Sequence, residues 1–264
     1  MGDRLKYDEY PGWFQKNFNF ELSKNSHQYY DSVSSKMKSD LEESKFWESL
    51  LNKIPDTHFE YQMEKKYPLV IDPHAGVKVF IKPYSSFIEK TYRINVLQNQ
   101  NFPKEPDKGW VTPDNWFHRV RDILRTQIAV KYLDGVEFVS QRITELCIQH
   151  NQNCSVDFEA RQEGYYAAHL SIEKTFEIPK MNWDTYKTNA FIEIQVTTQI
   201  QEVIKKLLHT YYESRRMEDQ ISKKWQWDYK SEEFSVNYLG HILHYVEGMI
   251  MEIRDKQIEK GKIS

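Results

Sequence analysis

The segment Phe191-Ile-Glu-Ile-Gln-Val-Thr-Thr198 is the most strand-like part of the chain. Its alternation places Ile192, Ile194 and Val196 on one face of a strand and Glu193, Gln195 and Thr197 on the other. Burying a lone carboxylate costs several kcal/mol unless a cation or a hydrogen-bond donor meets it. Two interpretations are therefore open: an edge strand with one solvated face, or a strand that carries a functional site.

The composition describes a globular chain without a strong charge preference. It has 264 residues with 39% hydrophobic residues, 28% charged residues and a formal net charge of -3, so bulk nucleic-acid binding is not indicated, although a local basic patch is compatible with these values. The only two cysteines, Cys147 and Cys154, favour free thiols in a reducing compartment over a disulfide or a zinc site. No apolar run approaches about 18 residues and the N-terminus lacks an apolar core, so we expect a cytoplasmic protein without a membrane span or signal peptide.

Helical and strand patterns alternate along the middle of the chain. Strands are predicted at 67–71, 77–81, 123–133, 156–159, 169–176 and 191–197, and helices at 34–51, 85–97, 136–150, 198–216 and 234–256. The segment 56–66 is predicted as a linker or the start of a strand, and 103–114 as a loop rich in Pro, Gly and Trp. This order predicts an α/β (α+β) fold, a mixed central sheet of about five strands flanked by helices.

A basic stripe precedes the central strands. Lys82, Ser86, Lys90 and Arg93 are spaced by 4, 4 and 3 residues, which aligns them on one face of a helix and the turn before it. Three cations and a hydroxyl on one stripe suit a polyphosphate, whereas the plainer alternative is a solvated helix face. Asp122 then stands at the start of an apolar strand, where a carboxylate is able to hold a divalent metal.

Taken in order, these motifs resemble the synthetase domain of the RelA/SpoT family, which makes the alarmone (p)ppGpp. The resemblance covers about Tyr67 to Arg216. It is carried by the basic stripe, by Asp122, by Gly164-Tyr165-x3-His169 and by Glu193-Ile-Gln195, with further support from His209-Thr-Tyr-Tyr212. It implies a nucleotidyltransferase-like core at 67–216, with a helical N-terminal extension at 1–66 and a C-terminal helical extension at 217–264 packed on that core.

The resemblance also implies an activity and its residues. Such enzymes transfer the β,γ-pyrophosphate of ATP to the 3′-hydroxyl of GDP or GTP with Mg²⁺. Asp122 and Glu193 would hold the metal, with Glu193 also the general base. The remaining roles are donor-phosphate binding by Lys82, Ser86, Lys90 and Arg93, and acceptor binding by Tyr165, His169, Gln195 and Arg161.

The chain departs from the family pattern where the donor base is expected to stack. Arg125 replaces the usual Gly after Asp122, Gln127 replaces one stacking Arg, and Phe80 replaces its partner. Phe80 keeps a flat face but no cation. Tyr166 and Ala167 also alter the residues that follow the motif tyrosine.

Two alternatives stay open. Some small members of this family are toxins that pyrophosphorylate the 3′ end of tRNA, and Arg119, Arg121, Arg125 and the 205–216 helix are candidates for holding that RNA. The other alternative is a catalytically weak regulatory module that binds nucleotides. A homo-oligomer or an antitoxin partner is compatible with the terminal helices, and the absence of a His-Asp dipeptide predicts that no alarmone hydrolase is present.

Overall fold

The computed structural model describes residues 5–180, 184–215 and 225–261, with the side chains of 208–215 excepted. Two compact units emerge from the packing of the backbone. The first comprises Met1–Glu43, Val79–Arg125 and Glu173–Glu193, and the second Ser44–Lys78, Thr126–Ile172 and Ile194–Ser264.

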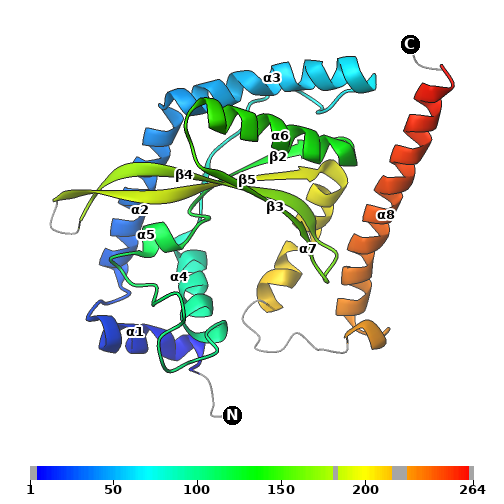
Figure 1. The fold of residues 1–264 in the computed structure, drawn as a ribbon. Helices are drawn as coiled ribbons and strands as arrows, with labels where there is room; N and C mark the ends of the chain where they lie inside the picture. The colour runs from blue at the N-terminus through cyan, green and yellow to red at the C-terminus, as the bar shows by residue number, and fades with distance from the viewer. Residues whose placement is uncertain (1–4, 181–183, 216–224, 262–264) are drawn as a thin grey trace. The chain divides into compact units, whose positions relative to one another are not determined.

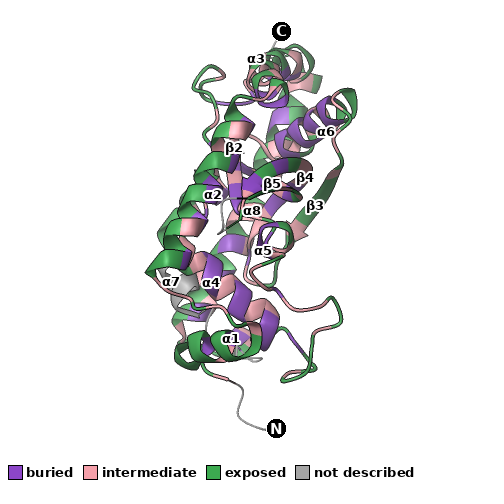
Figure 2. Ribbon diagram, turned by 90° about the vertical axis from the view of Figure 1, so that its left-hand side faces the viewer, coloured by how far each residue is buried: buried purple, intermediate pink, exposed green. Residues whose placement is uncertain are grey.

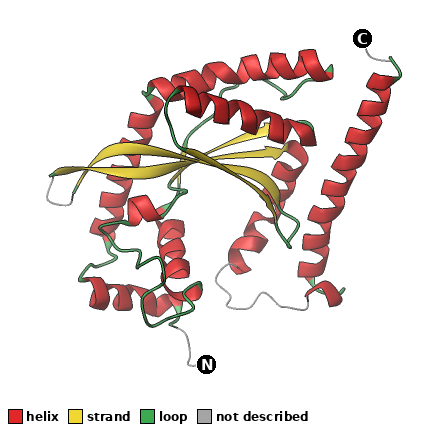
Figure 3. Ribbon diagram, in the orientation of Figure 1, coloured by secondary structure: helices red, strands yellow, loops and turns green. Residues whose placement is uncertain are grey.

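Five strands, yellow in Figure 3, form one sheet in the order β1-β2-β5-β4-β3. Their bounds are Phe80–Ile81 for β1, Leu124–Val130 for β2, Cys154–Ala160 for β3, Tyr166–Pro179 for β4 and Thr185–Thr198 for β5. β1 pairs with β2 and β3 with β4, both antiparallel. Strand β2 alternates strictly between buried and half-buried positions, as expected when one face lies on a core.

The first unit is built from short helices around a cluster of aromatic side chains. Its helices are α1 Tyr10–Phe18, α2 Lys24–Glu42, α4 Tyr84–Tyr92 and α5 Trp116–Arg119, with a short turn at Tyr7–Glu9 and a π-helical turn, Arg93–Leu97, that continues α4. The ring of Phe87 on α4 lies 4.5 Å from that of Tyr30 on α2 and 5.3 Å from that of Trp116, and all three are fully buried. Buried positions are purple along α4 in Figure 2. These rings fix one face of α4, so its opposite face is free to carry polar groups.

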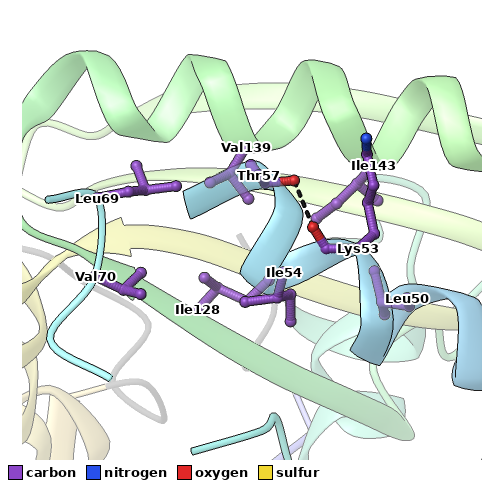
Figure 4. Close-up of a pocket in the computed structure, with 9 residues that line it drawn as sticks. All are labelled: Leu50, Lys53, Ile54, Thr57, Leu69, Val70, Ile128, Val139 and Ile143. Carbon is purple, nitrogen blue, oxygen red and sulfur yellow. Dashed lines mark hydrogen bonds between the residues drawn. The ribbon is translucent and has the colours of Figure 1, made fainter. Parts of the chain in front are cut away.

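The second unit packs two helices beside each other. Helix α3, Lys45–Lys65, contacts α6, Leu133–Gln149, and the two run close together in Figure 1. A small apolar cavity lies where α3 and α6 meet β2 and the segment before β1 (Figure 4). It is lined by Leu50, Lys53, Ile54, Thr57, Leu69, Val70, Ile128, Val139 and Ile143. Its apolar lining marks it as part of the core rather than a ligand site.

Helix α8, Glu232–Glu259, is fastened to this unit by a charged network. The Arg254 guanidinium donates to Asp134 Oδ2 at 2.8 Å and to the Tyr61 hydroxyl at 2.7 Å, and that hydroxyl donates to Asp134 Oδ1 at 2.7 Å. Arg254 is buried, with a side chain 4% exposed. Three elements, α3, α6 and α8, therefore meet at one satisfied ion pair.

Most of the predicted elements are confirmed, including the five-stranded sheet flanked by helices. Four details were wrong. The helix predicted at 34–51 is two helices, since α2 ends at Glu42 and α3 begins at Lys45. Residues 56–66 are not a linker, because α3 continues through Pro55 to Lys65. The segment 67–71 forms no strand, and of 77–81 only Phe80–Ile81 is a strand. The edge-strand interpretation of 191–198 is also wrong, since β5 lies between β2 and β4.

Other expectations have mixed outcomes. Both cysteines are free thiols, and Cys147 is buried. In the described part of the chain, none of the helices is long and apolar enough to cross a membrane. The predicted division into 1–66, 67–216 and 217–264 stays a prediction.

The Arg254 network predicts a pH-dependent contribution to stability. Burial alone would raise the pKa of Asp134, but the hydrogen bonds from Arg254 and Tyr61 outweigh it and lower the pKa below 3.8. A carboxyl with a depressed folded-state pKa stabilises the fold above its unfolded pKa and loses that contribution as the pH falls. Asp134→Asn should lower the free energy of unfolding in urea by about 1–3 kcal/mol at pH 7, and by progressively less from pH 4 downwards.

The matched control is Asp255→Asn, since Asp255 also accepts from Arg254 but its side chain is 56% exposed. An exposed pair contributes about 0–1 kcal/mol, so this variant should remain close to the parent. Equal losses in the two variants, or a loss at Asp134 independent of pH, would contradict the assignment.

Candidate functional site

A cluster of three charged groups occupies the first unit where β1 ends and β2 begins. Lys82 Nζ donates to Asp122 Oδ2 at 2.9 Å, and Lys90 Nζ donates to Asp122 Oδ1 at 2.8 Å. Their side chains are 6%, 27% and 17% exposed for Lys82, Lys90 and Asp122, respectively. Two cations around one carboxylate leave a net positive charge in a largely desolvated place, which suits an anion.

The backbone around Lys82 explains why this lysine is fixed. Its N–H donates to the carbonyl of Ile123 at 2.8 Å, which continues the pairing of β1 with β2. Its own carbonyl accepts from the buried Tyr30 hydroxyl at 2.6 Å. Strand β1 and helix α2 together therefore hold the lysine main chain before its side chain reaches Asp122.

The cluster perturbs the titration of its own members. Burial alone would raise the pKa of Asp122, yet the ammonium groups of Lys90 and Lys82 bring that pKa far below 3.8. Burial lowers the pKa of Lys82, and Asp122 opposes this effect. Asp122 is therefore a carboxylate at neutral pH, the form that a hard cation requires.

The rest of the predicted basic stripe continues from this cluster. Ser86 lies one helical turn before Lys90 on α4, and Arg93 opens the π-helical turn three residues after it. Residues three and four apart share a helix face, so Ser86 lies on the same face of α4 as Lys90. The structure brings Lys82 and Lys90 to Asp122, and a shared role for Ser86 and Arg93 stays a prediction.

The predicted donor-base residues lie along β1 and β2. Phe80 pairs directly with Arg125 across the two strands, and Phe80 is 54% exposed. Side chains directly opposite in an antiparallel pair share a face, so Phe80 and Arg125 lie on the same face of the sheet. Gln127 is half-buried two residues further along β2, and its Nε2 is covered and makes no hydrogen bond in the described part of the structure.

Glu193 lies in the interior of the sheet. It is half-buried between the fully buried Ile192 and Ile194, which confirms the alternation of β5. Gln195 follows on the same face of the strand. A polar pair on an interior strand needs polar partners, and Gln195 has one: its Oε1 accepts from Lys205 Nζ at 2.6 Å.

The second unit holds a separate cluster at the turn between β3 and β4. Arg161 N–H donates to the carbonyl of Tyr165 at 3.0 Å and Gly164 N–H to the carbonyl of Arg161 at 3.0 Å, which closes a tight turn. The Tyr165 hydroxyl lies 3.0 Å from His169 Nε2, and the Arg161 guanidinium lies 5.2 Å from the Tyr165 ring centre. Three of the four predicted acceptor residues, Tyr165, His169 and Arg161, therefore meet.

Sequence reasoning missed two members of this second cluster. Lys205, on helix α7 Gln199–Arg215, contacts both Gln195 and the Tyr165 ring, the latter at 5.7 Å. Glu159 lies 2.5 Å from Arg161 Nη2 and 3.6 Å from His169 Nε2. Only the strand register, which pairs Glu159 with Ala167, brings this carboxylate to the turn. The predicted His209 and Tyr212 contribution lies outside the described side chains.

Helix α8 braces this turn from outside the sheet. His241 Nε2 lies 2.9 Å from the carbonyl of Gln162, and its Nδ1 lies 2.8 Å from the Tyr166 hydroxyl. The His244 ring stacks on Tyr166 at 3.6 Å. Since a carbonyl only accepts, His241 donates through Nε2 and Nδ1 accepts from the tyrosine. The predicted C-terminal extension thus supports the residues beside Tyr165.

Two glycines permit this close approach. Gly164 has a φ of +76°, and a Cβ there would lie 2.5 Å from the carbonyl oxygen of Asn237 on α8. A Cβ on Gly240 would lie 2.3 Å from the carbonyl oxygen of Gly164. The glycine of the Gly-Tyr motif is therefore required both by its left-handed backbone and by contact with α8.

The donor set fits a magnesium ion better than a metal held by protein alone. Among the described residues, no group of three or more His, Cys, Asp or Glu side chains comes together as a metal site. Mg²⁺ commonly binds one or two carboxylates together with substrate phosphates and water. Asp122, ionised and beside the ammonium groups of Lys82 and Lys90, has the chemistry of such a ligand.

Comparisons with known proteins identify the fold. No protein-family model and no curated protein matches the chain. Small alarmone synthetase 1 of Bacillus subtilis, bound to its product pppGpp, matches with a TM-score of 0.53 and 15% identity over 88% of this chain and 98% of that one. The same enzyme in a second structure gives 0.51 and 15% over 89% and 97%. A GTP pyrophosphokinase family protein of Streptococcus pneumoniae gives 0.50 and 19% over 90% and 95%.

The chain thus has the fold of the small alarmone synthetases along nearly its whole length. This confirms the fold that the motifs imply.

The contact of α8 with the turn predicts opposite effects for two glycines of the same helix. Gly240→Ala should lower the free energy of unfolding by about 1–3 kcal/mol, because backbone atoms of Gly164 must move away from the new methyl group. A Cβ on Gly248 meets nothing within 4 Å, so Gly248→Ala should be stabilising by about 0.5–1 kcal/mol. Urea unfolding of the two variants measures the difference, and a neutral Gly240→Ala would mean that α8 does not press on the turn.

Proposed function

We propose that the chain is a pyrophosphokinase of the small alarmone synthetase type. It transfers the β,γ-pyrophosphate of ATP to the 3′-hydroxyl of GDP or GTP with Mg²⁺. The observation that carries this proposal is the half-buried carboxylate Asp122, which accepts hydrogen bonds from both Lys82 and Lys90. The fold shared with small alarmone synthetases supports it independently.

The first unit supplies the donor site in this proposal. Lys82, Lys90, Arg93 and Ser86 bind the oxygens of the ATP phosphates, because they are cations and a hydroxyl gathered on one side of α4. Magnesium bound by Asp122 and Glu193 would neutralise charge on the phosphates. Phosphoryl transfer depends mainly on positioning and charge neutralisation, and a fixed Lys82 meets both needs at little entropic cost.

The second unit supplies the acceptor site. Tyr165 offers a flat ring for a base, and its hydroxyl is fixed by His169. Gln195 and Lys205 form one hydrogen-bonded pair near the same ring and bind polar groups of the acceptor. Arg161 adds a cation on the ring face.

The reaction balances with these groups. The 3′-oxygen of the acceptor forms a bond to the β-phosphorus of ATP as the bond from that phosphorus to the bridging α,β-oxygen breaks, so AMP leaves. The proton of the 3′-hydroxyl passes to the Glu193 carboxylate. No covalent enzyme intermediate is needed, since positioned cations stabilise the charge that develops on the transferred group.

The proposal has one alternative for the acceptor, namely the 3′ end of tRNA. Several of the cations that are candidates for binding RNA already make contacts within the chain. Arg121 lies 4.6 Å from the Phe191 ring centre, Arg119 donates to the carbonyls of Lys108 and Gly109, and Lys205 is bonded to Gln195. These contacts give Arg119 and Arg121 partners within the chain, and the acceptor is decided by the assay below.

One assay separates the candidate functions. The protein is incubated with γ-labelled ATP, Mg²⁺ and GDP, GTP or deacylated tRNA. Transfer of label to the guanosine nucleotide supports the proposal, label on tRNA supports the toxin-like alternative, and nucleotide binding without transfer supports a regulatory module. Omission of Mg²⁺ should abolish transfer.

Replacement of the proposed base provides a mutational test. Glu193→Gln should lower the transfer rate by about 10³-fold or more, because it removes both a proton acceptor and a metal ligand. Urea unfolding should remain near that of the parent chain, since the amide is isosteric.

The matched control is Glu177→Gln, an exposed carboxylate on the neighbouring strand β4 that accepts from Thr185. This variant should keep the parental rate. Full activity in Glu193→Gln would reject Glu193 as the base, whatever the acceptor is.

A further inference from the structure

Glu159 is a largely covered carboxylate at the end of β3, beside the turn that carries Tyr165. Its side chain is 23% exposed, and its Oε2 is inaccessible to solvent. That oxygen lies 2.5 Å from Arg161 Nη2 and 3.6 Å from His169 Nε2. Glu is depleted in strands, so β-strand propensity does not explain why a glutamate occupies this covered position.

The register of β3 and β4 places Glu159 on the face of the ladder that carries His169. Glu159 pairs with Ala167 and Asp157 pairs with His169, so all four side chains lie on that face. The residue opposite Glu159 is thus the small Ala167. His169 on that face is bonded to the Tyr165 hydroxyl. The carboxylate and the aromatic ring are therefore two parts of one small site.

A flat ring with a carboxylate at its side matches one nucleobase in particular. Guanine presents two adjacent donors, the N1–H and the 2-amino group, and a carboxylate accepts both in a bidentate pair. Adenine presents an acceptor at N1, which a carboxylate repels. A site that hydrogen-bonds a substrate group discriminates strongly against an analogue that lacks this group.

We propose that Glu159 selects guanine as the base of the acceptor nucleotide, with Tyr165 as the stacking surface. This inference rests on the proposed function for the presence of an acceptor nucleotide, and it adds the residue that chooses the base. Arg161 neutralises the carboxylate in the free protein. Because the Arg161 side chain is 55% exposed, it is able to move outward and cover the base from the other side.

The competing explanation is structural: Glu159 serves only to hold Arg161. The two explanations differ in how they treat the 2-amino group of guanine. Inosine diphosphate is GDP without that amino group, so it keeps the ring, the ribose, the phosphates and the N1–H. A residue that merely positions Arg161 affects both nucleotides equally.

The experiment measures binding of GDP, IDP and ADP to the full chain by calorimetry, without ATP. The parent should bind GDP about tenfold more tightly than IDP, and ADP more weakly than either, because one charged hydrogen bond is lost in IDP and a repulsion is added in ADP. Glu159→Gln should reduce the ratio of the GDP and IDP affinities to near one. Its amide is able to accept only one of the two guanine donors and turns a donor toward the other.

Two control variants accompany it. Asp157→Asn removes the same charge from the same face of β3 at an exposed position, and it should leave the ratio unchanged. Arg161→Ala removes the ion-pair partner but keeps the carboxylate, so the ratio should persist even if all affinities fall. Arg161→Ala also tests the proposal if Glu159→Gln does not fold.

Several outcomes would overturn the proposal. They are a parent chain that binds GDP and IDP equally, an unchanged ratio in Glu159→Gln, and a ratio that collapses in Arg161→Ala as it does in Glu159→Gln. Selective GDP binding by a chain that transfers no pyrophosphate would reject the proposed function while it supports the role of Glu159.

Discussion

The interaction on which the first unit depends is the ion pair of Asp122 with Lys82 and Lys90. A carboxylate this buried is stable only with cations beside it, and both of its oxygens accept from one. The two lysines leave one positive charge in excess over the carboxylate. The backbone of Lys82 is held in place by its hydrogen bonds to Ile123 and Tyr30. The ion pair that stabilises this part of the fold is therefore also the proposed anion site. The stripe on α4 then extends this positive site along one helix face.

In the second unit, the main constraint is the position of the tight turn between β3 and β4. Gly164 adopts a left-handed backbone, and α8 approaches so closely at Gly240 that neither residue has space for a methyl group. His241 and His244 on the same helix contact Gln162 and Tyr166. Arg254 then fastens the far end of α8 to Asp134 and Tyr61. A C-terminal helix outside the motifs thereby holds the motif tyrosine in place.

The sequence predicted the parts of this structure that depend on local patterns. Period-two alternation predicted β5, and the 4-4-3 spacing predicted that Lys82, Ser86, Lys90 and Arg93 share a side. Where tertiary packing decides, the prediction failed: α3 continues through Pro55 because Thr57 and Tyr61 are buried beyond it. Glu159 was missed because its neighbours depend on the register between β3 and β4. The predicted strands, 156–159 and 169–176, place the turn over a longer segment than the structure does, so they do not pair Glu159 with Ala167. Lys205 was missed because its role depends on how α7 follows β5.

The departures from the family pattern fall mainly on the donor side of the proposed reaction. The acceptor turn keeps its Gly, Tyr and His, and the donor-phosphate cluster keeps every cation of the stripe. Tyr166 and Ala167 differ beside the acceptor turn, and on the donor side Phe80 and Gln127 stand in place of two expected arginines. Phe80 pairs directly with Arg125, so an exposed aromatic residue and an arginine share one face of the sheet, with Phe80 two residues before Lys82. Stacking on a ring and a guanidinium carries no hydrogen-bond information about the base. The proposed base selection therefore lies on the acceptor side, where the Glu159 carboxylate lies beside His169, the partner of the Tyr165 hydroxyl.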